Sequence, residues 1–337
     1  MDNFMTLNRK CKMGGWLAAA ILLLLAEFAL SLFIGKYPLR LDAMRAGDVQ
    51  ALRVFFTLRL PRTCMAVAGG FGLGMAGKVY QMVFRNPLAA PDVVGVSSGA
   101  SAGAAAAILF FSAAPVMVAV GAFAGGLLAV LLSLGLSALA PGRGHASIVL
   151  AGVAVHSLAQ TLLMVLKLTA DPEKELASIE YWIMGSLNGV TLAKVWPAVC
   201  ICGVGLLVLV VLYRQIVLLT VEEEEARLLG VAAGRMRLLV LLAATLAVTA
   251  VVSVTGLISF VGLLAPHTAR LVSRENGMPT LILSGLLGAA LLCGADMLAR
   301  SVAQAELPVS IFTSLLGAPF LIYLMVKKGE DGGFSST

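Results

Sequence analysis

The sequence predicts an all-α polytopic membrane protein with about ten transmembrane helices and an internal inverted repeat. Of its 337 residues, 60% are hydrophobic and 12% are charged, and the mean hydropathy is +0.98. A soluble domain is only about 45–50% apolar and about 25% charged, so most of this surface must face lipid. The apolar residues also gather in runs close to the ~20 residues that a helix needs to cross a bilayer. Such runs exclude a membrane barrel, whose strands would alternate.

Ten apolar segments along the chain are the candidate spans. The four clearest are 16–35, 114–140, 193–213 and 236–256. The other six are 62–84, 93–111, 147–168, 258–272, 279–298 and 308–326. Segment 258–272 follows segment 236–256 almost directly, with Gly256 at the boundary. It is short enough to enter the bilayer only partway. Together the ten segments are expected to form a single transmembrane domain over 1–337.

Two parts of the chain, about 60–168 and about 236–328, share a layout. Each holds four spans and one apolar stretch interrupted by proline, NPLAAPD at 86–92 and GLLAPHTAR at 262–270. Internal repeats with paired broken segments are typical of transporters. An ordinary cytosolic turn explains the two prolines of 86–92 equally well, because proline ends a helix wherever it removes a backbone donor.

The distribution of basic residues favours a cytoplasmic N-terminus. Short cytoplasmic loops are rich in lysine and arginine, and ten spans then place both termini in the cytoplasm. The segment 36–62 is the exception, because this topology puts it outside although it is basic. Its six cations are Lys36, Arg40, Arg45, Arg53, Arg59 and Arg62. Either the topology is wrong or this segment has a reason to be basic.

The stretch GLGMAGK at 72–78 fits the core of a phosphate-binding loop. Three facts oppose a nucleotide site there: Val79 lacks the hydroxyl that holds Mg²⁺, the motif sits inside an apolar helical run, and no later strand offers an acidic ligand. The alternative is close helix packing, since Gly70 and Gly74 form a GxxxG pair. Lys78 then lies near the inner end of the span and is expected to extend to the headgroups.

A short acidic helix is predicted at about 221–231, between the sixth and seventh spans. Glutamates occupy its first turn, where they suit the helix dipole, and Gly230 is placed to end it. A solvated loop helix would account for this pattern. However, Ala226, Leu228 and Leu229 are apolar for a helix that touches only water, so a cytosolic partner is expected to cover that face.

Seven motifs in order resemble one known family. They are RLPR (59–62), NPLAAPD (86–92), GVSSGA (95–100), EEEEARLLG (222–230), GLLAPHTAR (262–270), ADMLAR (295–300) and the pair ELP (306–308) with GAPF (317–320). Each is weak alone. Together, from about residue 15 to 328, the chain resembles the FecCD/BtuC-type permeases of ABC importers for iron-siderophores, haem and vitamin B12.

The resemblance implies a set of partners and a location. Such permeases are ten-helix subunits of the bacterial cytoplasmic (inner) membrane that pair with a second copy or a paralogue. Two ABC ATPase subunits bind below, an extracytoplasmic substrate-binding protein docks outside, and the cargo moves along the permease interface. ATP and Mg²⁺ belong to the ATPase, so this chain is expected to bind no cofactor, no metal and no nucleic acid and not to be an enzyme. Iron-siderophore is the expected cargo, with haem or vitamin B12 as alternatives.

The resemblance also implies where the partners touch. Arg59, Arg62 and Arg300 match outward-facing arginines that pair with glutamates of the binding protein. Snorkelling at a helix end is the alternative for Arg59 and Arg62, and a local i,i+4 pair with Asp296 is the alternative for Arg300. The predicted coupling helix, which seats in the ATPase, consists of Glu222, Glu223, Glu224, Glu225, Ala226, Arg227, Leu228, Leu229 and Gly230.

The cargo path is the third site that the resemblance implies. Asn86, Leu88 and Ser147 match regions that close the path on the cytoplasmic side. His156, Gln160 and Met164 fall near one face of the fifth predicted span, which borders the path in this family. Contact with cargo is one interpretation of His156, and a packed histidine is the favoured one.

Two other function classes compete with the importer. An ion-coupled secondary transporter would use ionisable residues inside its spans, and Glu27, Lys167 and Asp296 are the candidates. A membrane scaffold or receptor would leave the broken segments and the acidic helix unexplained.

Overall fold

The computed structural model describes residues 2–111, 113–139, 145–221, 223–230, 232–273, 276–303 and 305–332, and this part of the chain contains helices and no strand. Each predicted span has its helix. These helices are α1 (Asp2–Phe33), α4 (Leu60–Val83), α5 (Val96–Phe110), α6 (Pro115–Leu139), α7 (His145–Thr169), α9 (Leu192–Val211), α12 (Ala233–Thr255), α13 (Val261–Ser273), α14 (Met278–Ser301) and α15 (Val309–Gly332). The predicted all-α membrane fold is confirmed, whereas the inverted relation of the two halves stays a prediction.

By length and composition, six of the described helices can cross a bilayer unaided. These spans are Met13–Phe33, Pro115–Leu139, Ala146–Thr169, Leu192–Val211, Ala233–Thr255 and Met278–Ser301. The helices α5 and α13 are shorter, and α4 is diluted by glycine and polar residues. Such helices are stable in lipid only when their neighbours cover the polar groups.

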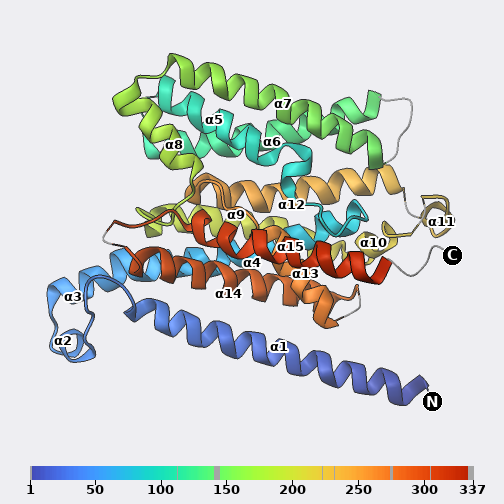
Figure 1. Cartoon of the computed structure of the whole chain (residues 1–337), viewed down its shortest axis with the longest axis horizontal. Helices are drawn as coiled ribbons and strands as arrows, with labels where there is room; N and C mark the ends of the chain where they lie inside the picture. Colours follow the sequence, from blue (N-terminus) through green and yellow to red (C-terminus); the bar gives the residue numbers. More distant parts are fainter. Residues whose placement is uncertain are drawn as a thin grey trace.

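Shorter helices lie between the spans. They are α2 (Leu41–Arg45), α3 (Val49–Arg53), η1 (Val54–Arg59), η2 (Pro91–Val94), η3 (Pro172–Leu176), α8 (Ala177–Ile183), α10 (Tyr213–Leu218) and α11 (Glu223–Leu228). Figure 1 shows α2 and α3 at one end of the bundle and α11 at the other. The start of α1 and the end of α15 lie at the α11 end, as an even number of spans requires.

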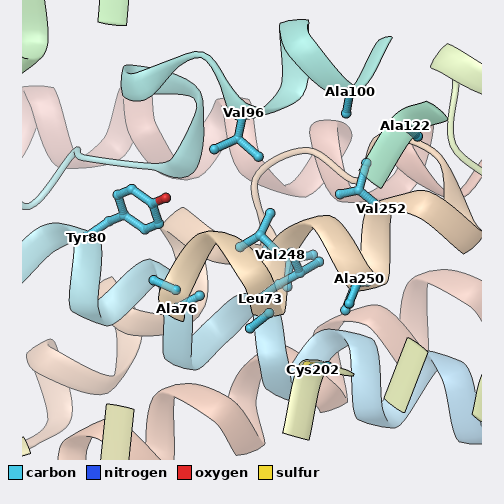
Figure 2. Packing of buried hydrophobic residues seen from close by; sticks show 14 of the residues in the cluster. Leu73, Ala76, Tyr80, Val96, Ala100, Ala122, Cys202, Val248, Ala250 and Val252 are labelled. Carbon is cyan, nitrogen blue, oxygen red and sulfur yellow. The ribbon is translucent and has the colours of Figure 1, made fainter. Parts of the chain in front are cut away.

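The long helices pack in three groups (Figure 1). In the first, α5, α6 and α7 lie together, and in the second, α9 runs beside α12. In the third, α4 packs against α13 and α14, while α1 lies along the outer edge on α14. The buried core joins these groups: Figure 2 shows Leu73 and Tyr80 of α4 near Val248 of α12 and Val96 of α5. The Tyr80 hydroxyl is paired with Thr245 Oγ1 at 2.7 Å, so this buried polar group is satisfied.

Glycines bring α4 into direct backbone contact with its neighbours. A Cβ added at Gly70 would stand 2.7 Å from the Cα of Ala289, and one at Gly74 would collide with the Ser284 carbonyl of α14. A Cβ at Gly77 would collide with the carbonyl of Gly262 in α13. The predicted packing role of the glycine run is therefore confirmed, and GLGMAGK lies inside helix α4, where it cannot form a phosphate-binding loop.

The expectation that Lys78 extends to the headgroups is wrong. Lys78 is 2% exposed, and its Nζ donates to Oδ1 of Asn276 at 2.9 Å. Asn276 lies in the segment before α14. The same glycines explain the error, because Gly74 and Gly77 draw α13 and α14 so close that they cover the lysine. Helix packing thus overrides the tendency of a terminal lysine to extend.

Both predicted broken segments are present, although the second is displaced. After α4 the chain leaves the helix at 84–90, passes through η2 and enters α5 at Gly95, whose φ is +83°. Between α12 and α13 the break lies at 256–260, where Gly256 and Phe260 have φ of +70° and +66°. The prediction that Pro266 marks the break is wrong, because Pro266 lies within α13.

Candidate functional site

The three predicted docking arginines meet at the end of the bundle that carries α2 and α3. Arg62 donates through Nε to Asp296 Oδ1 and through Nη1 to Glu306 Oε2, both at 2.7 Å. Arg300 donates through Nη2 to the Ser31 carbonyl at 2.8 Å, and its Nε lies 3.5 Å from Asp296 Oδ2. The local i,i+4 pair of Asp296 and Arg300 is therefore confirmed.

Arg59 belongs to the same cluster. Its guanidinium donates to the carbonyls of Ile34 and Tyr37, in the segment that follows α1. The cluster thus joins α1, α4 and α14 at one point. Arg62 pairs with the carboxylates of Asp296 and Glu306, Arg300 lies beside Asp296, and the carboxylate of Asp296 is fully buried.

The outward-facing arginines that the resemblance implies are not exposed in this chain. Arg59, Arg62 and Arg300 are all buried, and each donates to an intramolecular acceptor. Separation of a buried pair leaves an uncompensated charge, which is strongly destabilising. The predicted docking role stays a prediction. The structure adds Glu306, which sequence reasoning missed although it stands in the ELP motif.

At the opposite end, α11 presents the expected apolar surface. Leu228 is 88% exposed and Leu229 is 61% exposed, while Ala226 is buried against the chain itself. Gly230 ends the helix with a φ of +79°, as predicted, after Leu229 N donates to the Glu225 carbonyl. Other parts of the predicted coupling helix lie outside the described residues, namely Glu222 and the side chains of Glu223, Glu224 and Arg227.

Arg85, which was not among the predicted site residues, holds the chain that leads to α11. Its Nε donates to the Leu219 carbonyl at 3.3 Å, and its Nη2 donates to the Val221 carbonyl. Arg85 itself has a φ of +50°, a conformation that few non-glycine residues adopt. The end of α4 is therefore tied directly to the segment that precedes the candidate coupling helix.

The predicted gate residues lie near this end. Asn86 Oδ1 accepts from Leu88 N at 2.9 Å, so the turn after α4 is closed by an asparagine side chain. Leu88 is exposed, and Ser147 is partly buried near the start of α7, the helix that packs on η2. Their part in closing a cargo path stays a prediction.

The residues predicted to line the path lie on α7, a helix with few buried residues. His156 and Gln160 on α7 are partly buried and Met164 is exposed. A cavity of about 690 Å³ lies elsewhere, at the far end from α11, and Lys174, Tyr181, Trp182 and Asn188 are among its lining residues. The predicted path residues do not line it, so their role also stays a prediction.

The ionisable residues that a secondary transporter would need are mostly paired. Asp296 lies in the arginine cluster, and Lys167 Nζ lies 2.8 Å from Glu180 Oε1. Glu27 on α1 is partly buried beside α14. Within the described ranges, no three histidine, cysteine or acidic side chains gather as a metal site would require. These features favour structural roles for the charges inside the spans.

Comparison with known proteins gives one consistent result. The model of the FecCD transport family matches residues 22–327. The chain is 40% identical over 272 residues to the cobalamin import system permease BtuC of Halobacterium salinarum, covering 80% of this chain and 72% of that protein. It is 36% identical over 289 residues to the hemin transport permease HmuU of Yersinia pestis, covering 82% of this chain and 84% of that protein.

Two further comparisons extend the similarity over almost the whole chain. The molybdate import permease MolB of Haemophilus influenzae is 33% identical over 329 residues, covering 93% of this chain and 96% of that protein. A solved ABC transporter of metal-chelate type, in an inward-facing conformation, superposes with a TM-score of 0.83 at 33% identity. That match covers 92% of this chain and 98% of the solved chain.

Proposed function

Because this chain belongs to the FecCD transport family, we propose that it is the membrane permease of a binding-protein-dependent ABC importer for iron-siderophore complexes. The cargo moves along the interface between two permease chains, either identical copies or paralogues. Energy comes from ATP hydrolysis on two separate ATPase subunits, which hold the ATP and Mg²⁺. The α11 end faces the cytoplasm of a bacterial cell, which puts the start of α1 and the end of α15 on that side.

The observation that carries this proposal is the exposed leucine pair of α11. Leu228 and Leu229 are both exposed on this short helix. Exposed apolar side chains that lie together indicate a surface that another protein covers. The Arg85 contacts anchor the preceding segment, so force on α11 reaches the end of α4. This arrangement suits a contact through which an ATPase moves the permease.

Replacing Leu228 and Leu229 together by aspartate is expected to weaken ATPase binding at least about a hundredfold. Truncation of one central interface anchor costs about 2 kcal/mol or more, and each 1.4 kcal/mol is about tenfold in affinity. The affinity of the purified permease in lipid nanodiscs for its ATPase can be measured by biolayer interferometry.

Val49→Asp provides the matched control for this test. Val49 is as exposed as the leucines but lies on α3, at the opposite end of the molecule. This variant should bind the ATPase like the unaltered protein. An L228D/L229D variant that still forms the four-chain complex would rule out α11 as the contact.

The cargo is the least constrained part of the proposal. The relatives are named for cobalamin, hemin, molybdate and, in Escherichia coli FepG, ferric enterobactin. Cobalamin is the second candidate, because the relative with 40% identity is a cobalamin permease. Uptake of labelled ferric siderophore, hemin and cobalamin into proteoliposomes that contain the complete importer would distinguish them. Uptake that follows an ion gradient without ATP would instead identify the remote alternative, a secondary transporter.

We further propose that an acidic substrate-binding protein docks over the buried arginine cluster, with Glu306 at its rim. Glu306 keeps part of its side chain exposed and neutralises Arg62. Replacing Glu306 by glutamine should therefore leave the rim more positive and accelerate capture of the binding protein severalfold at low salt, because rim charges act mainly on association rates.

Stopped-flow association at several salt concentrations measures this effect, with Glu225→Gln at the opposite end as the charge-matched control. If both variants associate at the unaltered rate, the binding protein docks away from Arg62.

A further inference from the structure

A small basic cavity lies at the α11 end of the bundle. It has a volume of about 190 Å³, and its polar lining comes from Lys78, Gln81, Arg85, Thr220, Arg270 and Asn276. These residues belong to the end of α4, the segment before α11, α13 and the approach to α14. A water molecule occupies about 30 Å³ of liquid, so the cavity is large enough for a tetrahedral oxyanion.

Lys78 is the reason to look for an anion here. A buried ammonium is costly unless a charge or several hydrogen bonds compensate it. The amide of Asn276 accepts one of its three possible hydrogen bonds, and the Tyr213 hydroxyl holds Asn276 by donating to its carbonyl at 2.9 Å. The described residues that line the cavity include no carboxylate, while 274–275 lie outside the described part of the chain.

The two arginines complete a set of donors around Lys78. Arg85 is held in place by its contacts with the carbonyls of Leu219 and Val221, which use Nε and Nη2. Its Nη1 carries two further N–H donors. Arg270 is exposed on α13 at the edge of the cavity. Two guanidinium groups and one ammonium around one small space match the charge and the hydrogen-bonding capacity of a phosphate.

We propose that this cavity binds a phosphate group, supplied either by the headgroup of an anionic lipid or by free inorganic phosphate. Basic pockets between transmembrane helices at the cytoplasmic surface are suited to anionic headgroups. A bound phosphate would bridge Arg270 of α13 and Arg85, and so steady the segment that leads into α11. The site itself does not depend on the transported cargo. The cytoplasmic location of this cavity rests on the orientation proposed above.

The test uses the full chain alone, without its ATPase, so that failure of the site and failure of the importer proposal remain distinguishable. In the lipid arm, native mass spectrometry counts phosphatidylglycerol and phosphatidylcholine molecules retained from mixed nanodiscs. In the phosphate arm, the thermal midpoint in phosphatidylcholine nanodiscs is measured with inorganic phosphate and with sodium chloride at equal ionic strength.

Arg270→Gln is the main variant, because its exposed side chain can change without disturbing the core. It should reduce phosphatidylglycerol retention or apparent phosphate affinity at least about tenfold, since charge-assisted hydrogen bonds to phosphate are among the strong ones. Lys78→Gln should have at least the same effect. Arg235→Gln, an exposed arginine outside the cavity, is the control and should change neither quantity.

The two arms identify the source of the phosphate. Selective retention of phosphatidylglycerol that R270Q abolishes assigns the site to lipid, and a phosphate-specific rise of the midpoint that R270Q abolishes assigns it to free phosphate. The proposal is overturned if R270Q and R235Q behave alike in both arms. The proposal is also overturned if phosphatidylglycerol is retained no better than phosphatidylcholine and inorganic phosphate raises the thermal midpoint no more than sodium chloride does.

Discussion

Replacing Asp296 by asparagine is expected to destabilise the folded chain by about 3–5 kcal/mol, the usual cost of removing one partner from a buried ion pair. Asp296 is fully buried and faces both Arg62 and Arg300. An asparagine keeps the shape but leaves the buried guanidinium groups of Arg62 and Arg300 with Glu306, whose side chain is 29% exposed, as the remaining carboxylate. The thermal midpoint of the purified permease and the fraction that stays monodisperse on heating both report the loss.

The control for D296N is Asp92→Asn, because Asp92 is exposed in η2, just before α5, and accepts from the Ser97 hydroxyl. That variant should change the midpoint little. Glu306→Gln should fall between the two, since water reaches part of the Glu306 side chain. Equal midpoints for D296N and D92N would show that the arginine cluster contributes little to stability.

Replacing Gly74 by leucine is expected to prevent stable folding. The expected loss of stability is on the order of 4 kcal/mol or more, which is exceptional for a single substitution. Even a Cβ at this position would collide with the Ser284 carbonyl. A backbone oxygen in a helix cannot move aside like a flexible side chain, so α4 and α14 must separate. Expression followed by size-exclusion chromatography should show little monodisperse protein.

Gly135→Leu is the matched control, because a Cβ at Gly135 of α6 meets no atom within 4 Å. Its side chain would face lipid, where leucine is favourable, and the folded yield should be retained. A smaller step, Gly74→Ala against Gly135→Ala, makes the same comparison with a single added Cβ. If the two leucine variants give equal yields, close contact between α4 and α14 is not required.

The course of the chain through the membrane was predictable from the sequence, because apolar run length decides which segments leave water. Each of the ten predicted segments has a helix, and the ends of α6, α7 and α12 agree with prediction to within about three residues. The role of Gly70 and Gly74 was also predictable, since small residues four apart allow backbones to meet in lipid. Both inferences depend on local sequence alone.

The errors concern contacts between residues far apart in the sequence. Lys78 and Asn276 are 198 positions apart, and Arg62 and Glu306 are 244 apart. A charged residue near a helix end is predicted to be exposed, because a charge without a partner is most stable in water. A partner supplied by a distant helix reverses that choice, and a single sequence contains no signal for it. The Asp296–Arg300 pair was found because both members lie on one helix.

The position of the second break has a similar explanation. Pro266 was expected to interrupt the helix, but α13 continues past it with its Gly262 carbonyl facing Gly77. A proline in a helix frees the carbonyl four residues earlier, and here a glycine on the neighbouring helix makes room for that carbonyl. The chain bends instead at 256–260, where Gly256 has a conformation that most residues avoid.

Helix α4 can be regarded as a mechanical part. Its 24 residues extend about 36 Å at 1.5 Å per residue. Arg62 joins one end to the arginine cluster, and Arg85, just beyond the other end, holds the segment before α11. Between these attachments, backbone contacts at Gly70, Gly74 and Gly77 restrict sliding and tilting of α4 against α13 and α14. A push on α11 would therefore travel the length of α4 as through a stiff rod, and α13 and α14 would move with it.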